Sequence, residues 1–241
     1  MFIDDTRPEL RGETRPGLKK LFFQDGITDE MVDAAVKMGN ALCALGCGKE
    51  IATDLTLLTL YDVVLLIADD SGSMKTEEGG KRIETLKIAL KFVAAVIKLA
   101  RNEGIKAIRF LNSKKVWTDV QRKTHKIIED HPFRHWSRIG TELKNKIINK
   151  HVFGSEMKRP LLVITITDGD AEGESKNLLV SVIHECIEKL RDLHKEKTEH
   201  GADAIGFQFA KVGNDQGAER LLKRLDDDLK VGDYVDCFPS R

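Results

Sequence analysis

Five residues in three separate segments carry side chains that could bind a hard metal ion. They are Asp69, Ser71, Ser73, Thr141 and Asp168. The first three form an Asp-x-Ser-x-Ser pattern directly after the apolar run 63–68. The threonine follows a glycine at the start of a helical pattern, and the last aspartate follows the apolar run 161–167. Carboxylates and hydroxyls offer oxygen ligands, which suit Mg²⁺ or Mn²⁺ rather than a soft metal. The pattern predicts a site for one divalent cation.

The elements that must position these residues alternate between strand and helix from Asp62 onward. The predicted strands are 63–68, 105–111, 161–167, 204–212 and 234–238. The predicted helices are 83–102, 119–130, 141–151, 176–197 and 216–229. This alternation predicts an α/β fold with a doubly wound, mostly parallel sheet flanked by helices. Segment 115–118 is too close to the preceding strand for a crossover helix, so it predicts an antiparallel edge strand.

The first predicted strand is expected at the centre of the sheet. Its apolar run 63–68 is almost unbroken, and such a strand needs cover on both faces. Ligands of open α/β sheets bind beyond the carboxyl ends of the strands. If the central strands are adjacent, the three segments with oxygen ligands meet at one edge of the sheet.

In this order, the five residues resemble the metal-ion-dependent adhesion site (MIDAS) of the von Willebrand factor type A (vWA) domain, whose pattern is Asp-x-Ser-x-Ser, then Thr, then Asp. All five positions match, and the resemblance covers roughly 62–238. It implies that the two serines bind the metal directly, that the two aspartates hold metal-bound waters, and that the threonine binds directly or through water. It also implies a module for binding a protein partner, whose Asp or Glu completes the coordination of the metal.

Residues 1–60 fall outside the resemblance. Residues 1–27, with two prolines and little periodicity, predict an extended arm. A helix is expected from Thr28 onward, because a hydroxyl N-cap is followed by two acids. Its apolar face is formed by Met31, Ala35, Met38, Leu42 and Leu45. We therefore expect an N-terminal arm and helical extension docked on a vWA domain of residues 61–241.

Composition limits the class of partner and the location. Lys and Arg number 39, as do Asp and Glu, and this balance argues against a nucleic-acid partner. No apolar run approaches the about 20 residues that a membrane span needs. The acidic N-terminus lacks the pattern of a secretory signal, and the four cysteines are too few for a disulfide framework. These features favour an intracellular, cytoplasmic chain.

Two other functions fit the motif less well than protein binding. Mg²⁺-dependent phosphatases of the haloacid-dehalogenase type also place an aspartate after the first strand, but they need a second one two residues later, where this chain has Ser71. No histidine lies in the three site segments to serve as a general base, so an enzyme is not expected. The other alternative is a structural vWA domain whose metal site only makes the loops rigid.

Several conspicuous residues have plainer interpretations. Asp70 is expected on the solvated surface, because its position varies in the family. His131 and His135 have the spacing of helical metal ligands, but a proline lies between them. Phe92 belongs to an apolar helix face that is expected to pack on the sheet, and Trp136 is expected to pack in a loop.

Overall fold

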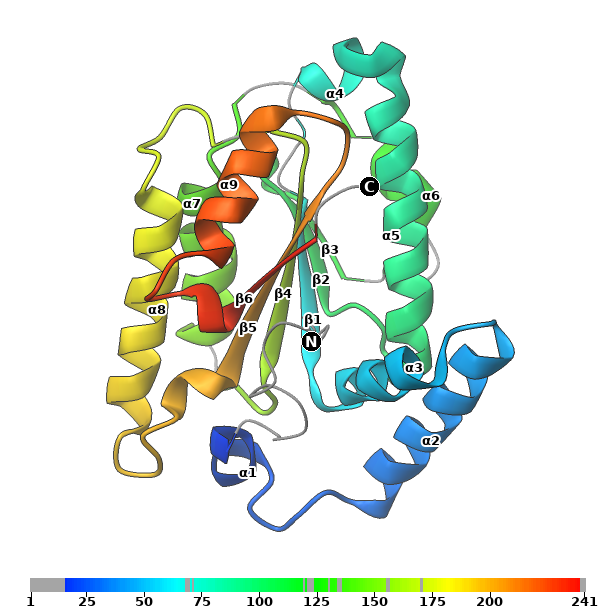
Figure 1. Ribbon diagram of the computed structural model, residues 1–241, viewed down its shortest axis with the longest axis vertical. Coiled ribbons are helices and arrows are strands. Elements are labelled where there is room, and N and C mark those ends of the chain that lie inside the picture. The colour runs from blue at the N-terminus through cyan, green and yellow to red at the C-terminus, as the bar shows by residue number, and fades with distance from the viewer. Residues whose placement is uncertain are drawn as a thin grey trace.

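The part of the chain that the structure describes is built on a six-stranded sheet (Figure 1). This computed structural model describes residues 16–67, 70, 72–118, 120, 124–129, 131–133, 136–154, 157–169 and 171–238. The strands are β1 (Asp62–Ile67), β2 (Ala107–Phe110), β3 (Val116–Trp117), β4 (Leu161–Thr167), β5 (Ile205–Lys211) and β6 (Val235–Phe238). Their order is β3-β2-β1-β4-β5-β6, and every neighbouring pair is parallel except β2 and β3. The predicted mostly parallel sheet, its central first strand and its antiparallel edge strand are confirmed.

Helices cover both faces of this sheet. The α-helices are α1 (Pro16–Phe22), α2 (Asp29–Ala44), α3 (Lys49–Leu55), α4 (Ser73–Thr76), α5 (Lys81–Ala100), α6 (Thr124–Glu129), α7 (Ile139–Glu142), α8 (Leu178–His194) and α9 (Gln216–Asp226). The 3-10 and π segments are η2 (Thr56–Leu60), η3 (Glu77–Gly80), η5 (Leu143–Val152), η6 (Gly201–Ala204) and η7 (Gly232–Tyr234). Helices α5 and α6 pack on one face, and α7 to α9 with η5 pack on the other (Figure 1). Within these described segments, none of the helices combines the length and the apolar character that crossing a membrane requires.

The burial of β1 explains its central place. Val63 and Leu65 point into the hydrophobic cluster under α5, whereas Val64 points into the cluster under α8. Successive side chains of a strand point to opposite faces, so a strand covered on both sides must be apolar at every position. All three side chains are at most 1% exposed.

The register of the sheet brings the candidate segments to one edge. Ile67, the last residue of β1, lies opposite Phe110 of β2 and Ile166 of β4. Since these strands are parallel, the carboxyl ends of β1, β2 and β4 lie side by side. Ligands bind at this edge in open α/β sheets.

The N-terminal arm is not extended in its described part. Helix α1 begins at Pro16, a residue that the first turn of a helix tolerates. The amide of Gly17 donates to Asp203 Oδ2 at 2.9 Å, and Leu18 and Phe23 are buried. The expectation of an extended arm over 1–27 is therefore wrong for α1. These tertiary contacts hold a segment whose own periodicity is too short to predict a helix.

Helix α2 begins where the sequence predicts and packs on α5. The Thr28 hydroxyl accepts from the helix, as an N-cap does. Met38 and Leu42 are buried against Ala100. Leu45, however, is 78% exposed, so its predicted place on the docking face is wrong: the helix ends at Ala44, and the following residue no longer shares that face. The division of the chain into an extension and a main domain stays a prediction.

Phe92 of α5 is 67% exposed, so its predicted packing on the sheet is wrong. The inward face of this helix is set by Leu86, Leu90, Ala94 and Ile97, which are buried at spacings of three and four residues. Two residues after Leu90, the helix has turned by about 200°, so Phe92 points away from the sheet.

Candidate metal centre

Three of the five predicted ligands lie within the described residues. They are Ser73, Thr141 and Asp168; the other two, Asp69 and Ser71, lie outside the described residues. All three come from segments at the carboxyl edge of the sheet. Ser73 begins α4, Thr141 lies in the first turn of α7, and Asp168 directly follows β4.

The structure brings Ser73 and Asp168 together. The Ser73 hydroxyl donates to Asp168 Oδ2 at 3.1 Å. The Asp168 side chain is completely buried, and its other oxygen, Oδ1, has no hydrogen-bond partner among the described residues. An unsatisfied buried acceptor costs about 1–3 kcal/mol, and more when it is charged. A carboxylate oxygen of this kind beside a hydroxyl fits a hard cation such as Mg²⁺ or Mn²⁺.

The candidate centre depends on hydroxyls as much as on charge. Among the described residues, no three carboxylate, imidazole or thiol side chains gather as a metal-binding cluster. A centre built from Ser73, Thr141 and Asp168 has only one carboxylate among its described residues. Asp168 offsets half of the charge of a divalent ion, and Asp69, which lies outside the described residues, is the only other carboxylate of the proposed set.

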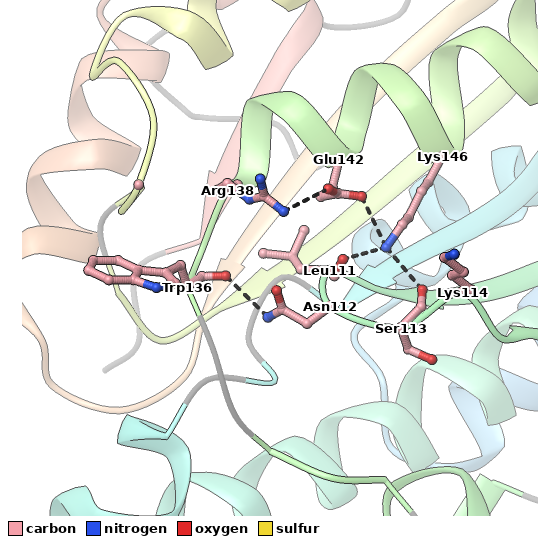
Figure 2. A pocket seen from close by; sticks show the side chains of 9 residues that line it. Leu111, Asn112, Ser113, Lys114, Trp136, Arg138, Glu142 and Lys146 are labelled. Atoms are coloured by element: carbon pink, nitrogen blue, oxygen red, sulfur yellow. Dashed lines mark hydrogen bonds and ion pairs between the residues drawn. The ribbon is translucent and has the colours of Figure 1, made fainter.

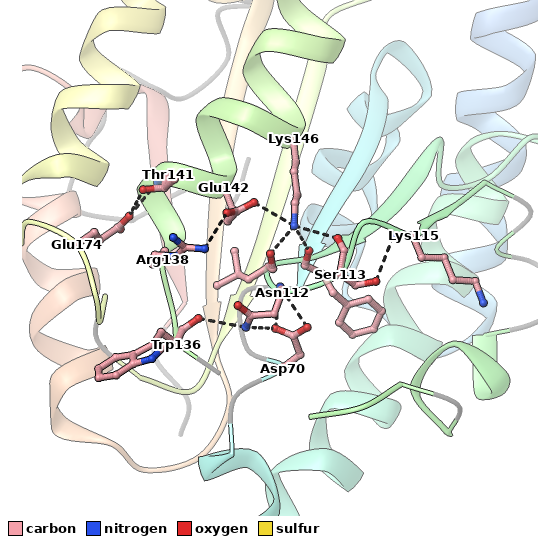
Figure 3. Close-up of polar contacts among 12 residues, drawn as sticks. Asp70, Asn112, Ser113, Lys115, Trp136, Arg138, Thr141, Glu142, Lys146 and Glu174 are labelled. Atoms are coloured by element: carbon pink, nitrogen blue, oxygen red, sulfur yellow. Dashed lines mark hydrogen bonds and ion pairs between the residues drawn. The ribbon is translucent and has the colours of Figure 1, made fainter. Parts of the chain in front are cut away.

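Thr141 is held by a residue that the sequence did not single out. Glu174, in the loop after β4, accepts from the amides of Gly140 at 2.8 Å and Thr141 at 2.9 Å (Figure 3). It also accepts from the Thr141 hydroxyl at 2.8 Å. Because the hydroxyl donates its proton there, its lone pairs stay available to a cation. Nothing in the sequence distinguishes Glu174 from the neighbouring Glu172.

Gly140 permits this close approach, and we predict that Gly140→Ala disturbs it. A Cβ at this position would lie 2.9 Å from the backbone nitrogen of Leu179 and 3.2 Å from Glu174 Oε1. We expect a loss of about 1–3 kcal/mol in the free energy of unfolding, and weaker Mn²⁺ binding because Thr141 moves. Urea unfolding and paramagnetic resonance of Mn²⁺ measure the two effects.

Gly39→Ala in α2 is the matched control. Its nearest neighbour is a side-chain methyl of Thr56 at 3.4 Å, and alanine is favoured over glycine in a helix by about 1 kcal/mol. It should therefore leave stability and metal binding intact or improve stability. Equal behaviour of the two variants would contradict the tight contact at Gly140.

Asp168 also forms a buried ion pair that the sequence analysis missed. Arg82 Nη1 lies 2.8 Å from Asp168 Oδ2, Nε lies 2.8 Å from Glu78, and Nη2 lies 2.6 Å from Glu77. The Arg82 side chain is only 3% exposed. Burial by itself lowers the pKa of Arg82, but the hydrogen bonds to Glu78 and Asp168 outweigh it and raise the pKa above its ordinary value. The hydrogen bond from Arg82 also lowers the pKa of Glu78.

Asp70 is buried, not solvated, which corrects the expectation from the sequence. It is 1% exposed and accepts from the Asn112 amide at 3.1 Å and from Asn112 Nδ2 at 2.6 Å (Figure 3). His131 Nε2 lies 2.7 Å from Asp70 Oδ2, and its ring stacks on Phe110 at 3.6 Å. These neighbours come from segments far along the chain, so local sequence does not predict that they bury Asp70. His131 thus serves as a partner of Asp70, while His135 lies outside the described residues.

We predict that Asp70→Ala loosens the loop that carries Asp69 and Ser71. Removing the carboxylate leaves the Asn112 amide and the His131 ring without their acceptor, at a cost of about 1–3 kcal/mol in the free energy of unfolding. Mn²⁺ affinity should fall with it. Asp25→Ala, at an exposed aspartate, should stay within about 0.5 kcal/mol of the wild type. An Asp70→Ala variant as stable as Asp25→Ala would show that the buried contacts are not stabilising.

A hollow of about 680 Å³ lies beside this centre (Figure 2). Its lining comes from residues 111–114 after β2, from Trp136 and Arg138 before α7, and from Glu142 and Lys146 on α7 and η5. Trp136 is 63% exposed, so its predicted packing within a loop is wrong.

Comparison with known proteins extends only to the fold. No model of a known protein family and no curated protein matches the chain. Among solved structures, proximal thread matrix protein 1 from the mussel byssus is 17% identical over 75% of this chain and 44% of that chain, with a TM-score of 0.47. A von Willebrand factor type A protein from Catenulispora acidiphila is 16% identical over 75% of this chain and 39% of that chain, with a TM-score of 0.46. The chain thus spans less than half the length of either, and likeness at this level concerns the course of the backbone alone.

Proposed function

We propose that this chain is a protein-binding module of the vWA kind, in which a divalent cation receives an acidic side chain of a protein partner. The observation that carries the proposal is the buried Asp168 carboxylate, which contacts the Ser73 hydroxyl and has one oxygen without a hydrogen-bond partner among the described residues. Thr141 supplies a further hydroxyl at the same edge of the sheet. Asp69 and Ser71 complete the proposed set through the sequence motif.

The donor set supports binding of an acid. Mg²⁺ or Mn²⁺, when bound, supplies a positively charged centre with an open coordination position. Ser73 and Thr141 are neutral. Asp69 and Asp168 formally offset the two charges of the ion, but the charge of Asp168 is shared with Arg82. The positive charge that remains attracts a carboxylate from outside the chain.

Catalysis is not part of the proposal. A phosphatase would need a carboxylate at the position of Ser71. The neighbouring carboxylate, Asp70, is already engaged by Asn112 and His131. This arrangement favours Asp70 as a support for the loop rather than as a nucleophile or a base.

An immobilised oligoglutamate peptide tests the proposal, with oligoglutamine as the neutral control. We expect the full chain to bind oligoglutamate in Mg²⁺, to release it in chelator, and to bind again when Mg²⁺ returns. Ser73→Ala should weaken this binding without unfolding the chain, whereas Ser181→Ala, on α8, should not change it.

Two results would point to the alternatives. Hydrolysis of a phosphoester that disappears in Asp69→Asn would favour the phosphatase. Tight binding of Mn²⁺ without any metal-dependent binding of acidic peptides would favour a structural metal site.

A further inference from the structure

The hollow beside α7 shares its borders with the candidate metal centre. Glu142, in its lining, directly follows Thr141. Asn112, also in its lining, donates to Asp70 in the loop after β1 (Figure 3). A ligand at the metal edge therefore lies next to this hollow.

Two cations of the hollow, Arg138 and Lys114, are less engaged by carboxylates of the described residues than Lys146 is. Lys146 is fully engaged: its ammonium donates to the carbonyl of Phe110. It also donates to the carbonyls of Leu111 and Ser113 and lies 3.0 Å from Glu142 (Figure 2). Arg138, in contrast, reaches Glu142 only at 3.7 Å and is about half exposed. Lys114 is exposed and has no ion-pair partner among the described residues.

A further cation, Arg109, interacts electrostatically with Glu142 of the lining. Arg109 is buried on β2, and its Nε has no hydrogen-bond partner among the described residues. Burial lowers the pKa of Arg109, and the charge of Glu142 opposes this effect. Among the described lining residues, Glu142 is thus the one carboxylate beside several cations, and the nearby Glu174 is already used by Gly140 and Thr141.

An exposed aromatic ring completes the rim. Trp136 and Arg138 both lie beside Gly173, where an added Cβ would be in ordinary van der Waals contact with each side chain, at 3.5 Å. The backbone of Gly173 is left-handed, with a φ of 74°, which favours glycine. Exposed tryptophan and arginine side chains are the residues most enriched at the energetic centres of protein interfaces.

We propose that this hollow receives a second acidic side chain of the partner, which Arg138 and Lys114 bind while the first acid completes the metal site. The inference rests on the proposed function. The partner segment is therefore an acidic one, with carboxylates a few residues apart. Charge complementarity is the reason for this choice: the exposed charged side chains that line the hollow, Arg138 and Lys114, are both cationic, and the metal edge beside it selects the same chemistry.

The experiment compares two peptides in Mg²⁺. One is oligoglutamate, and the other has a single glutamate within oligoglutamine. We expect the wild type to bind oligoglutamate more tightly than the single-glutamate peptide. The double variant Arg138→Gln/Lys114→Gln should lose about tenfold in affinity for oligoglutamate and keep its affinity for the single-glutamate peptide and for Mn²⁺. Emission from Trp136 should respond to oligoglutamate, and Trp136→Phe should remove this response.

The control variant Lys37→Gln/Lys49→Gln removes the same charge from exposed lysines of α2 and α3. Equal losses in the two double variants would overturn the inference, because general charge attraction would then explain the binding. Equal binding of both peptides to the wild type would overturn it and leave the proposed function intact. Failure of both peptides to bind in Mg²⁺ would overturn both proposals. If a short single-stranded oligonucleotide displaced bound oligoglutamate, the inference would be overturned, because the hollow would then bind a phosphate backbone rather than an acidic peptide.

Discussion

Arg82→Met is expected to lower the free energy of unfolding by about 3–5 kcal/mol in chelator, because it leaves Asp168 as an unpaired buried carboxylate. The Arg82 guanidinium contacts Asp168, Glu77 and Glu78, and the pair with Asp168 is buried on both sides. Part of the loss should return in Mn²⁺ or Mg²⁺, since a cation can take the place of the lost charge. A ligand at a hundred times its Kd stabilises the folded state by about 2.7 kcal/mol. Urea unfolding with and without metal measures both effects.

Arg191→Met is the control for this variant. Arg191 pairs with Glu188 on the exposed surface of α8, and such pairs contribute about 0–1 kcal/mol. Its stability should not depend on metal. The double variant Arg82→Met/Asp168→Asn should cost less than the sum of its single changes, because the two residues interact directly. If Arg82→Met lost no more free energy of unfolding than Arg191→Met does, with no dependence on metal, that result would contradict a role for Arg82 at the centre.

Arg82→Met is also expected to change the affinity of the site for metal. Arg82 shares the charge of Asp168, so the guanidinium competes with a cation for that carboxylate. We expect Mn²⁺ to bind Arg82→Met more tightly than it binds the wild type. An arginine at this place weakens the bond to the metal but leaves the ion more electrophilic toward a partner's acid. Arg82 therefore lowers the affinity of the site for the metal and raises the affinity of the bound metal for the partner's carboxylate.

The fold could be predicted from the sequence because its signals are local. The apolar run of β1 needs cover on both faces, and the alternation of strand and helix requires parallel pairing. Segment 115–118 could be assigned to an edge strand by its short distance from β2. The errors lie where packing outweighs local pattern: α1 forms through the contact of Gly17 with Asp203, and Phe92 points outward because α5 has only one buried face.

The candidate site could be predicted only in its motif residues. Helical spacing places Arg82 on the same face as Leu86 and Leu90, yet no local signal indicates that Asp168, 86 residues further along the chain, lies opposite it. Asp70 illustrates the same limit. Its burial depends on His131 and Asn112, which the tertiary fold brings to it. A sequence motif identifies the ligands, but the residues that hold those ligands in place are brought to them by contacts between distant segments.

Asp168→Asn is expected to abolish the binding of Mn²⁺, the largest effect on the proposed site of any single change. The amide keeps the shape of the side chain but removes the only carboxylate among the described candidate ligands, and a neutral oxygen binds a hard cation far more weakly. We expect Mn²⁺ affinity to fall by at least about a hundredfold, since loss of mere supporting residues already costs about 10–100-fold. Asp203→Asn is the matched control, because Asp203 is a buried carboxylate whose hydrogen bond within the described part of the chain comes from the backbone of α1. If Asp168→Asn bound Mn²⁺ as the wild type does, the cation would not lie at this edge of the sheet, and the assignment of the centre would be wrong.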